Sequence, residues 1–289
     1  MSGRLAGVAL HLSALALFVA MDTMVKLLTA RYAVPQLMWA RFLFSLLAAA
    51  VVLRLTTGHL PWRSRAPGLQ ALRSLLLAAC NLLFSTALAH IPLADATAVG
   101  FASPVLTVAL AALWLRERVG WRRWAGVGIG LLGVLIVLRP PFLTGAPMHW
   151  AMLLPLGTAA LFAVYQILTR RLAGLDDSRT TILHTGFAAT IATSLAQPLV
   201  WTWPSGGDWA VLVLLGLLGG AGHGLLVLAY ARAPASLLAP LSYTQLVWAS
   251  LAGILVFGDW PDRTSLLGAA VIAAGGLLVA LPGRRHNSR

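Results

Sequence analysis

Asp22 and Lys26 lie inside one long apolar stretch, and Arg41 lies inside the next. A charge at the centre of a membrane-spanning helix costs about 2.5–3.5 kcal/mol, so such residues usually carry a function. Hydropathy places Asp22 and Arg41 at similar depth. Three interpretations follow: an ion pair between Asp22 and Arg41, an ion pair between Asp22 and Lys26 one turn away, or a free Asp22 that binds a substrate ammonium group or a coupling proton.

Uncharged polar and aromatic side chains recur in pairs 142 residues apart. The pairs are Asn81 with His223, Phe101 with Tyr243, and Ser103 with Gln245. This pattern predicts a pseudo-symmetric lining around one cavity that binds a small amphipathic molecule. The alternative is that these groups only hydrogen-bond between helices, at about 0.6 kcal/mol each. For His223, a neutral hydrogen-bonded ring is favoured over a proton carrier, because no acidic neighbour is visible in the sequence.

Three further residues are candidates for the same lining. Tyr165 and Gln166 fall in the half of their apolar stretch where inversion places the counterpart of Asp22, although a tyrosine there also suits the membrane interface. Trp248 lies one turn from Gln245 and faces either the cavity or lipid. We expect all three to contact substrate.

Other chemistry is poorly represented. The chain has no H-E-x-x-H or G-x-S-x-G motif and no pair of intramembrane aspartates, which argues against an intramembrane enzyme. A Walker-type phosphate loop is absent, and so is the ring of repeated polar residues that a channel filter needs. Cys80 is the only cysteine. We expect no metal site and no cofactor.

The elements that carry these residues are apolar blocks of spanning length. Hydrophobic residues make up 59% of the 289 positions and charged ones 10%, against about 25% charged in soluble domains. Blocks of about 20 residues match the hydrocarbon thickness of a bilayer. We predict an all-α membrane protein of ten spans, at residues 5–28, 35–55, 69–89, 93–114, 121–139, 149–170, 179–202, 208–231, 235–257 and 264–282.

Basic residues follow the positive-inside rule. With the N-terminus in the cytoplasm, fifteen of the 21 Lys and Arg residues fall on the inner side and three on the outer side. This distribution predicts that both termini are cytoplasmic. The net charge of +13 therefore reflects membrane orientation, and we expect lipid rather than nucleic acid as the surrounding partner.

The chain repeats itself at the same 142-residue offset. Aligned pairs include Pro92 with Pro234, Glu117 with Asp259, Gly126 with Gly268, Gly133 with Gly275, and Pro140 with Pro282. We therefore expect two five-helix repeats, residues 1–141 and 142–289. Because five is odd, the second repeat enters the membrane from the opposite side, as in many secondary transporters.

The repeat resembles the EamA family of the drug/metabolite transporter superfamily. The resemblance is carried by Ala102-Ser103-Pro104-Val105, by the segment 114–118 that contains Glu117, and by Phe257-Gly258-Asp259. The glycine-spaced segments from Gly126 to Pro140 and from Gly268 to Pro282 complete it. The second copy has Asp259 where the family usually has Glu. The resemblance implies a central cavity lined by the first, third, fourth, sixth, eighth and ninth spans, in a bacterial inner-membrane exporter.

These observations predict a secondary transporter of small metabolites that works by alternating access, driven by the gradient of the substrate or of protons. An aromatic, neutral cavity suits export of hydrophobic or aromatic amino acids. An accessible Asp22 instead suits cationic metabolites such as S-adenosylmethionine. An intramembrane enzyme or a channel is the alternative from another class.

Overall fold

The computed structural model describes residues 2–114, 120–139, 148–172, 174–234, 237–238 and 241–280, and these residues form helices and no strand. Glu117, Pro140 and Pro282, which support the repeat, lie outside the described residues. In chain order the elements are α1 (Ser2–Leu28), α2 (Val34–Thr57), α3 (Pro67–Leu88), α4 (Leu93–Gly100), α5 (Ser103–Trp114), α6 (Trp121–Leu138), η1 (Trp150–Met152), α8 (Leu153–Leu172), α9 (Ser178–Ser194), α10 (Gln197–Val200), α11 (Gly206–Arg232), α13 (Thr244–Ala252), η2 (Gly253–Phe257) and α14 (Arg263–Ala280).

Six segments are long and apolar enough to cross a bilayer by length and composition: Gly3–Leu28, Val34–Thr57, Pro67–Leu88, Leu93–Trp114, Trp150–Leu172 and Gly206–Arg232. Trp124–Leu138, Thr244–Phe257 and Arg263–Leu278 are shorter apolar helices. The predicted span 179–202 is divided into α9 and α10, because Pro198 cannot continue a helix past Ser194. An all-helical membrane protein is confirmed, whereas the count of ten spans stays a prediction.

The predicted span 93–114 is broken between α4 and α5. Pro104 has no N–H group and disfavours a helical conformation at the residue before it. Accordingly α4 ends at Gly100, and the Phe101 N–H bonds back to the Thr97 and Ala98 carbonyls at 3.1 and 3.2 Å. The break places Phe101 between two half-helices. Its repeat partner Tyr243 likewise lies directly before α13.

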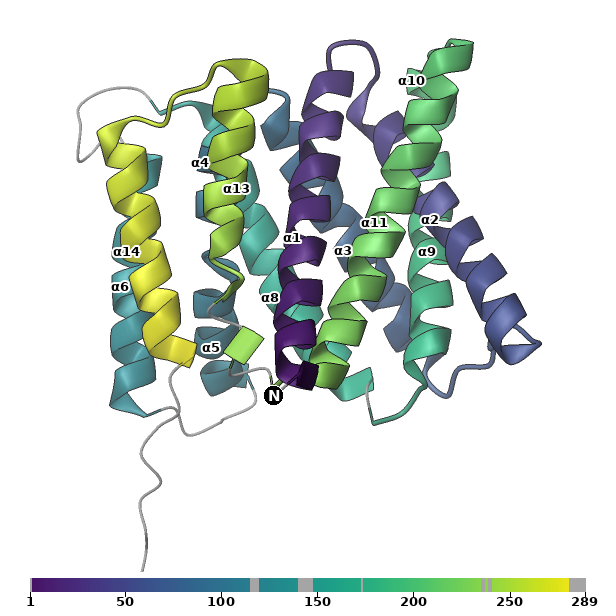
Figure 1. The fold of residues 1–289 in the computed structure, drawn as a ribbon, viewed down its shortest axis with the longest axis horizontal. Coiled ribbons are helices and arrows are strands. Elements are labelled where there is room, and N and C mark those ends of the chain that lie inside the picture. Colours follow the sequence, from purple (N-terminus) through teal and green to yellow (C-terminus); the bar gives the residue numbers. More distant parts are fainter. Residues whose placement is uncertain are drawn as a thin grey trace, which may run out of the picture.

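The helices stand side by side, as Figure 1 shows, with α6 and α14 at one end of the molecule and α2 and α9 at the other. Between the two ends, α11 packs against both α1 and α2, while α8 packs against α3 and α5. The central helices α1, α3, α4, α8, α11 and α13 carry most of the predicted site residues.

Glycines allow α6 and α14 to approach closely. A Cβ at Gly133 would lie 2.6 Å from the Ile272 nitrogen, and a Cβ at Gly275 would lie 2.5 Å from the Gly130 nitrogen. Neither position accepts a larger residue without separating the helices, so these glycines serve packing.

The outer surface is apolar. Leu55, Leu199 and Leu255 each expose 80% or more of their surface. Such side chains would favour aggregation in water, whereas acyl chains solvate them. The apolar surface of the described residues is therefore consistent with a membrane protein.

Candidate substrate-binding chamber

A cavity of about 200 Å³ lies where α3, α4, α5, α8 and α13 meet. Its lining combines three phenylalanines with hydroxyl and amide groups: Phe84, Thr97, Gly100, Phe101, Ser103, Thr158, Ala159, Phe162 and Gln245. Phe101, Ser103 and Gln245 are among the residues that the sequence predicts. The lining comes from both sides of the repeat boundary, and its aromatic faces and few polar groups suit an amphipathic ligand.

Phe101 and Tyr243 meet across the repeat. Their ring centroids are 5.1 Å apart and the rings are tilted by 36°. Tyr243 is held against α14 at Gly276, where a Cβ would overlap the Tyr243 hydroxyl. The residue pair that the 142-residue offset relates thus lies at one place beside the cavity.

Arg73 forms a buried network that sequence reasoning missed. It is 6% exposed, and its guanidinium donates to Thr169 and Thr185 at 2.7 Å each and to the Tyr165 hydroxyl. Its guanidinium carbon also lies 4.4 Å from the Tyr165 ring centroid. The available signal was an arginine inside an apolar span. Its hydroxyl partners come from α8 and α9 and carry no charge, so charge pairing could not point to them.

Tyr165 connects this network to the cavity. Its ring stacks on Phe162, a lining residue, with centroids 5.1 Å apart. Tyr165 therefore lies behind the cavity wall and not in it. The adjacent Gln166 is exposed, and no described residue hydrogen-bonds to its side chain.

Asp22 and Arg41 are buried, with exposed fractions of 8% and 9%. No ion pair within 4.0 Å joins them among the described residues. The predicted direct pair is therefore not formed, although α1 and α2 both pack on α11 (Figure 1).

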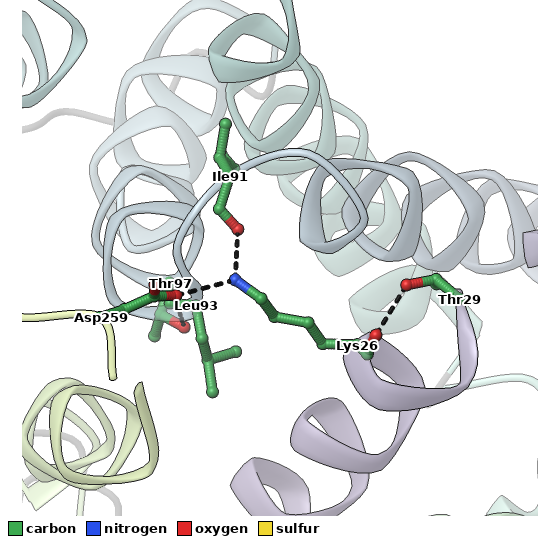
Figure 2. A network of polar contacts seen from close by, with 6 residues as sticks. All are labelled: Lys26, Thr29, Ile91, Leu93, Thr97 and Asp259. Atoms are coloured by element: carbon green, nitrogen blue, oxygen red, sulfur yellow. Dashed lines mark hydrogen bonds and ion pairs between the residues drawn. The ribbon is translucent and has the colours of Figure 1, made fainter. Parts of the chain in front are cut away.

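Lys26 does not pair with Asp22, so that interpretation is wrong. Its ammonium group donates instead to Asp259 at 3.1 Å and to the Ile91 carbonyl at 2.9 Å, as Figure 2 shows. We call Lys26, Ile91 and Asp259 the Lys26 bridge. Gly258 positions Asp259, because its φ of +71° turns the chain after η2.

The Lys26 bridge lies next to the cavity. Thr97, a lining residue, donates to the Leu93 carbonyl at 2.7 Å one turn from the bridge (Figure 2). The bridge joins α1 and the α3–α4 connection to the segment after η2. It thus ties the two parts of the chain together at the end remote from the N-terminus.

The remaining predicted residues are divided. His223 packs edge-on against Phe18, with centroids 5.0 Å apart. Its side chain is exposed and does not line the cavity. Asn81 donates to the Leu77 carbonyl of its own helix at 2.7 Å. Trp248 is 42% exposed and does not line the cavity.

At the opposite end of the molecule, Asp176 ties the α8–α9 connection to the start of α3. It accepts hydrogen bonds from Ser64 at 2.5 Å, from the Arg65 backbone at 2.8 Å and from Gln70 at 2.8 Å. The Ser64 hydrogen bond, followed by the Arg65 one, holds the pKa of the Asp176 carboxyl below its ordinary value of 3.8. In the described part of the chain, no group of three His, Cys, Asp or Glu residues is arranged to hold a metal ion.

Comparison with known sequences identifies the family. The profile of the EamA-like transporter family matches twice, at residues 5–139 and 149–281. The chain belongs to the EamA-like transporter family. The two matches cover nearly all of it.

Relatives in the EamA-like family include transporters of small metabolites. The chain is 33% identical over 223 residues to a riboflavin transporter of Rhizobium johnstonii, covering 76% of this chain and 70% of the relative. It is 26% identical over 287 residues to an S-adenosylmethionine uptake transporter of Rickettsia felis, covering 99% and 96%. A solved crystal structure shares the fold, with a TM-score of 0.64 at 22% identity over 94% of this chain and 95% of that chain.

These findings agree on a coarse assignment. The protein is a multi-pass membrane protein of a transporter family with bacterial relatives, and the names of its relatives support a small-metabolite transporter. Export of amino acids has no counterpart among those names.

Proposed function

We propose that this EamA-like protein is a gradient-driven carrier that moves small amphipathic metabolites across a bacterial inner membrane by alternating access. The cavity lies between two inverted five-helix repeats, residues 1–141 and 142–289, with both termini in the cytoplasm. The observation that carries the proposal is the lining itself. Phe101 and Ser103 from the first repeat and Phe162 and Gln245 from the second surround one space.

Reciprocal contacts support the two-fold relation of the repeats. Gly133 approaches Ile272 and Gly268, while Gly275 approaches Gly130 and Gly126. A shift of 142 residues exchanges these two sets of contacts. Helix pairs exchange in the same way: α1 packs on α11 as α8 packs on α3, and α2 packs on α11 as α9 packs on α3. Inverted repeats of this kind move against each other in secondary transporters.

The Lys26 bridge is the element that alternating access must break on one side. By the positive-inside rule the end that carries the bridge faces the periplasm. The ion pair between Lys26 and Asp259 joins the two repeats, while the hydrogen bond to the Ile91 carbonyl positions Lys26 within the first repeat. We therefore expect the ion pair to open when the cavity faces outward. A charge-assisted hydrogen bond contributes about 1.5–3 kcal/mol, which is enough to bias such an equilibrium tenfold or more.

The substrate we propose has a ring and a polar tail. Riboflavin and S-adenosylmethionine, which the relatives are named for, both have a heteroaromatic ring attached to a polar chain. The phenylalanines of the cavity offer stacking surfaces for a ring, and Thr97, Ser103 and Gln245 offer hydrogen bonds. An aromatic amino acid fits the same description, while the S-adenosylmethionine relatives are named for uptake and not for export.

The test is counterflow in proteoliposomes that contain the purified full-length protein. Vesicles preloaded with unlabelled S-adenosylmethionine, riboflavin or L-phenylalanine are given the corresponding labelled compound outside. We expect saturable, transient accumulation of at least one of the three. Unsaturable flux would indicate a channel, and conversion of the compound would indicate an enzyme.

A reversible control links transport to the bridge. In a Cys80→Ser background, Lys26→Cys and Asp259→Cys are joined by a short bis-methanethiosulfonate reagent. Joining the two positions should stop counterflow, and reduction should restore it. Full counterflow in the cross-linked protein would contradict alternating access at this bridge.

A further inference from the structure

Asp22 and Arg41 form an unusual combination: two opposite charges, each more than nine-tenths buried, that have no hydrogen-bond or ion-pair partner among the described residues. Neither side chain has a polar atom that is both fully sealed and without a partner, so the polar atoms of both keep some accessible surface. A buried charge without a partner is costly, so both side chains are suited to a charged ligand.

The two residues lie at matching depth on either side of α11. Asp22 is six residues before the end of α1 and Arg41 is seven after the start of α2, about 9–10 Å along each helix axis. Each of these helices packs on α11 (Figure 1). The two side chains therefore face a common region from two directions.

Glycine in α11 allows side chains of α1 and α2 to approach this helix closely. A Cβ at Gly219 would lie 3.3 Å from the Met21 sulfur and 3.7 Å from Arg41 Nε. Side chains of α1 and α2 thus meet over Gly219, where α11 contributes no side chain of its own. His223, one turn further along α11, is the next polar group on that helix.

Arg73 provides the contrast. It is buried to a similar degree, but three hydroxyl groups satisfy its guanidinium. Arg41 has no such partners in the described part of the chain, although the fold supplies them to another buried arginine. This difference points to a ligand for Arg41.

We infer that Asp22 and Arg41 together bind the α-ammonium and α-carboxylate groups of a zwitterionic ligand. The inference rests on the proposed carrier function and names its substrate class. A zwitterion satisfies both charges, whereas a simple anion leaves Asp22 unpaired and a simple cation leaves Arg41 unpaired. Arg41 suits the carboxylate because guanidinium binds it through two parallel hydrogen bonds. The two side chains form no ion pair with each other within 4.0 Å, so each is available to one charged group of the ligand.

The test compares matched ligands on the purified full-length protein in detergent, by isothermal titration calorimetry. The probes are S-adenosylmethionine with its decarboxylated form, and L-phenylalanine with 2-phenylethylamine and 3-phenylpropionate. We expect at least one zwitterion to bind about tenfold or more tightly than its analogue without the carboxylate. Arg41→Met should abolish that preference.

Asp22→Asn should abolish the preference over the analogue without the ammonium group. Arg31→Gln is the matched control, because Arg31 is an exposed arginine in a separate ion pair with Asp208. If Arg41→Met does not give a monodisperse protein, Arg41→Lys decides the question. It keeps the charge but not the paired geometry, so the carboxylate preference should fall severalfold.

Two results would overturn the inference: an unchanged carboxylate preference in the Arg41 variants, or binding of none of the zwitterions by the unaltered protein. Counterflow of riboflavin together with no zwitterion binding would support the carrier function and contradict the zwitterion site. Zwitterion selectivity without saturable exchange would support the zwitterion site and contradict the carrier function.

Discussion

Lys26 and Asp22 lie one turn apart on α1, but of the two only Lys26 has an ion-pair partner in the described part of the chain. The Lys26 bridge joins distant segments of the protein through two short contacts. Asp22 is instead buried and makes neither an ion pair nor a side-chain hydrogen bond among the described residues. The comparison teaches that one helix carries two kinds of charge: one that stabilises a particular arrangement of the repeats, and one that is left for a ligand.

Neutralising the unpaired charges should have the largest effect. Asp22→Asn combined with Arg41→Gln removes two charge-assisted contacts to the proposed zwitterion, each contributing about 1.5–3 kcal/mol. We expect counterflow of a zwitterionic substrate at low concentration to fall about a hundredfold. Arg31→Gln removes an exposed ion pair and should leave counterflow within about twofold. A double variant that exchanges substrate at the original rate would show that these charges serve folding only.

Opening the Lys26 bridge should have an intermediate effect. Because Cys80 is the only cysteine, Cys80→Ser provides a background in which Ser103→Cys reports on the cavity. A membrane-impermeant thiol reagent added outside should label this cysteine slowly. Adding Lys26→Met should raise the labelling rate about tenfold, because the contacts that hold the repeats together are lost. Equal rates with and without Lys26→Met would mean that the bridge does not control access.

Part of this comparison was predictable from sequence. Hydropathy gave the depth of Asp22 and Arg41, because a residue's distance from the end of its span depends only on chain position. It could not give their lateral separation, which depends on how α1 and α2 pack on α11. The expected ion pair was therefore placed at the right depth but does not form.

The partners of Lys26 and Arg73 show the same limit. Asp22 is near Lys26 in sequence, while Asp259 is 233 residues away and reaches it only through the turn at Gly258. Arg73 depends on hydroxyls from two other helices, which no charge pattern reveals. In contrast, the 142-residue repeat relates Phe101 and Tyr243 directly, and their ring centroids lie 5.1 Å apart beside the cavity that both were predicted to line.

A substitution beneath Arg41 should sharpen the comparison with a smaller effect. The Cβ that Gly219→Ala adds would press on the Met21 sulfur at 3.3 Å and contact Arg41 Nε at 3.7 Å. We expect the dissociation constant for a zwitterion to rise a fewfold, because a small overpacking shifts the side chain it touches. Gly224→Ala on the same helix is the matched control, since nothing lies within 4 Å of its Cβ. Equal affinities of the two variants for the zwitterion would mean that Gly219 does not lie in the binding region.

The smallest effect is expected at the end of the molecule opposite the Lys26 bridge, where Asp176 accepts hydrogen bonds from Ser64, the Arg65 backbone N–H and Gln70. The pKa of Asp176 is lower in the folded protein than its ordinary value of 3.8. The ionised carboxylate therefore stabilises the fold above pH 3.8, and this stability is lost as the pH falls through the lowered pKa. Asp176→Asn should lower the melting temperature in detergent by about 2 °C at neutral pH, and the difference should shrink below about pH 4. Asp177→Asn is the control, because asparagine caps α9 as well as aspartate does. Asp176 lies far from Asp22 and Arg41, so Asp176→Asn should bind zwitterions normally. A loss of zwitterion binding would mean that the two ends of the protein are coupled.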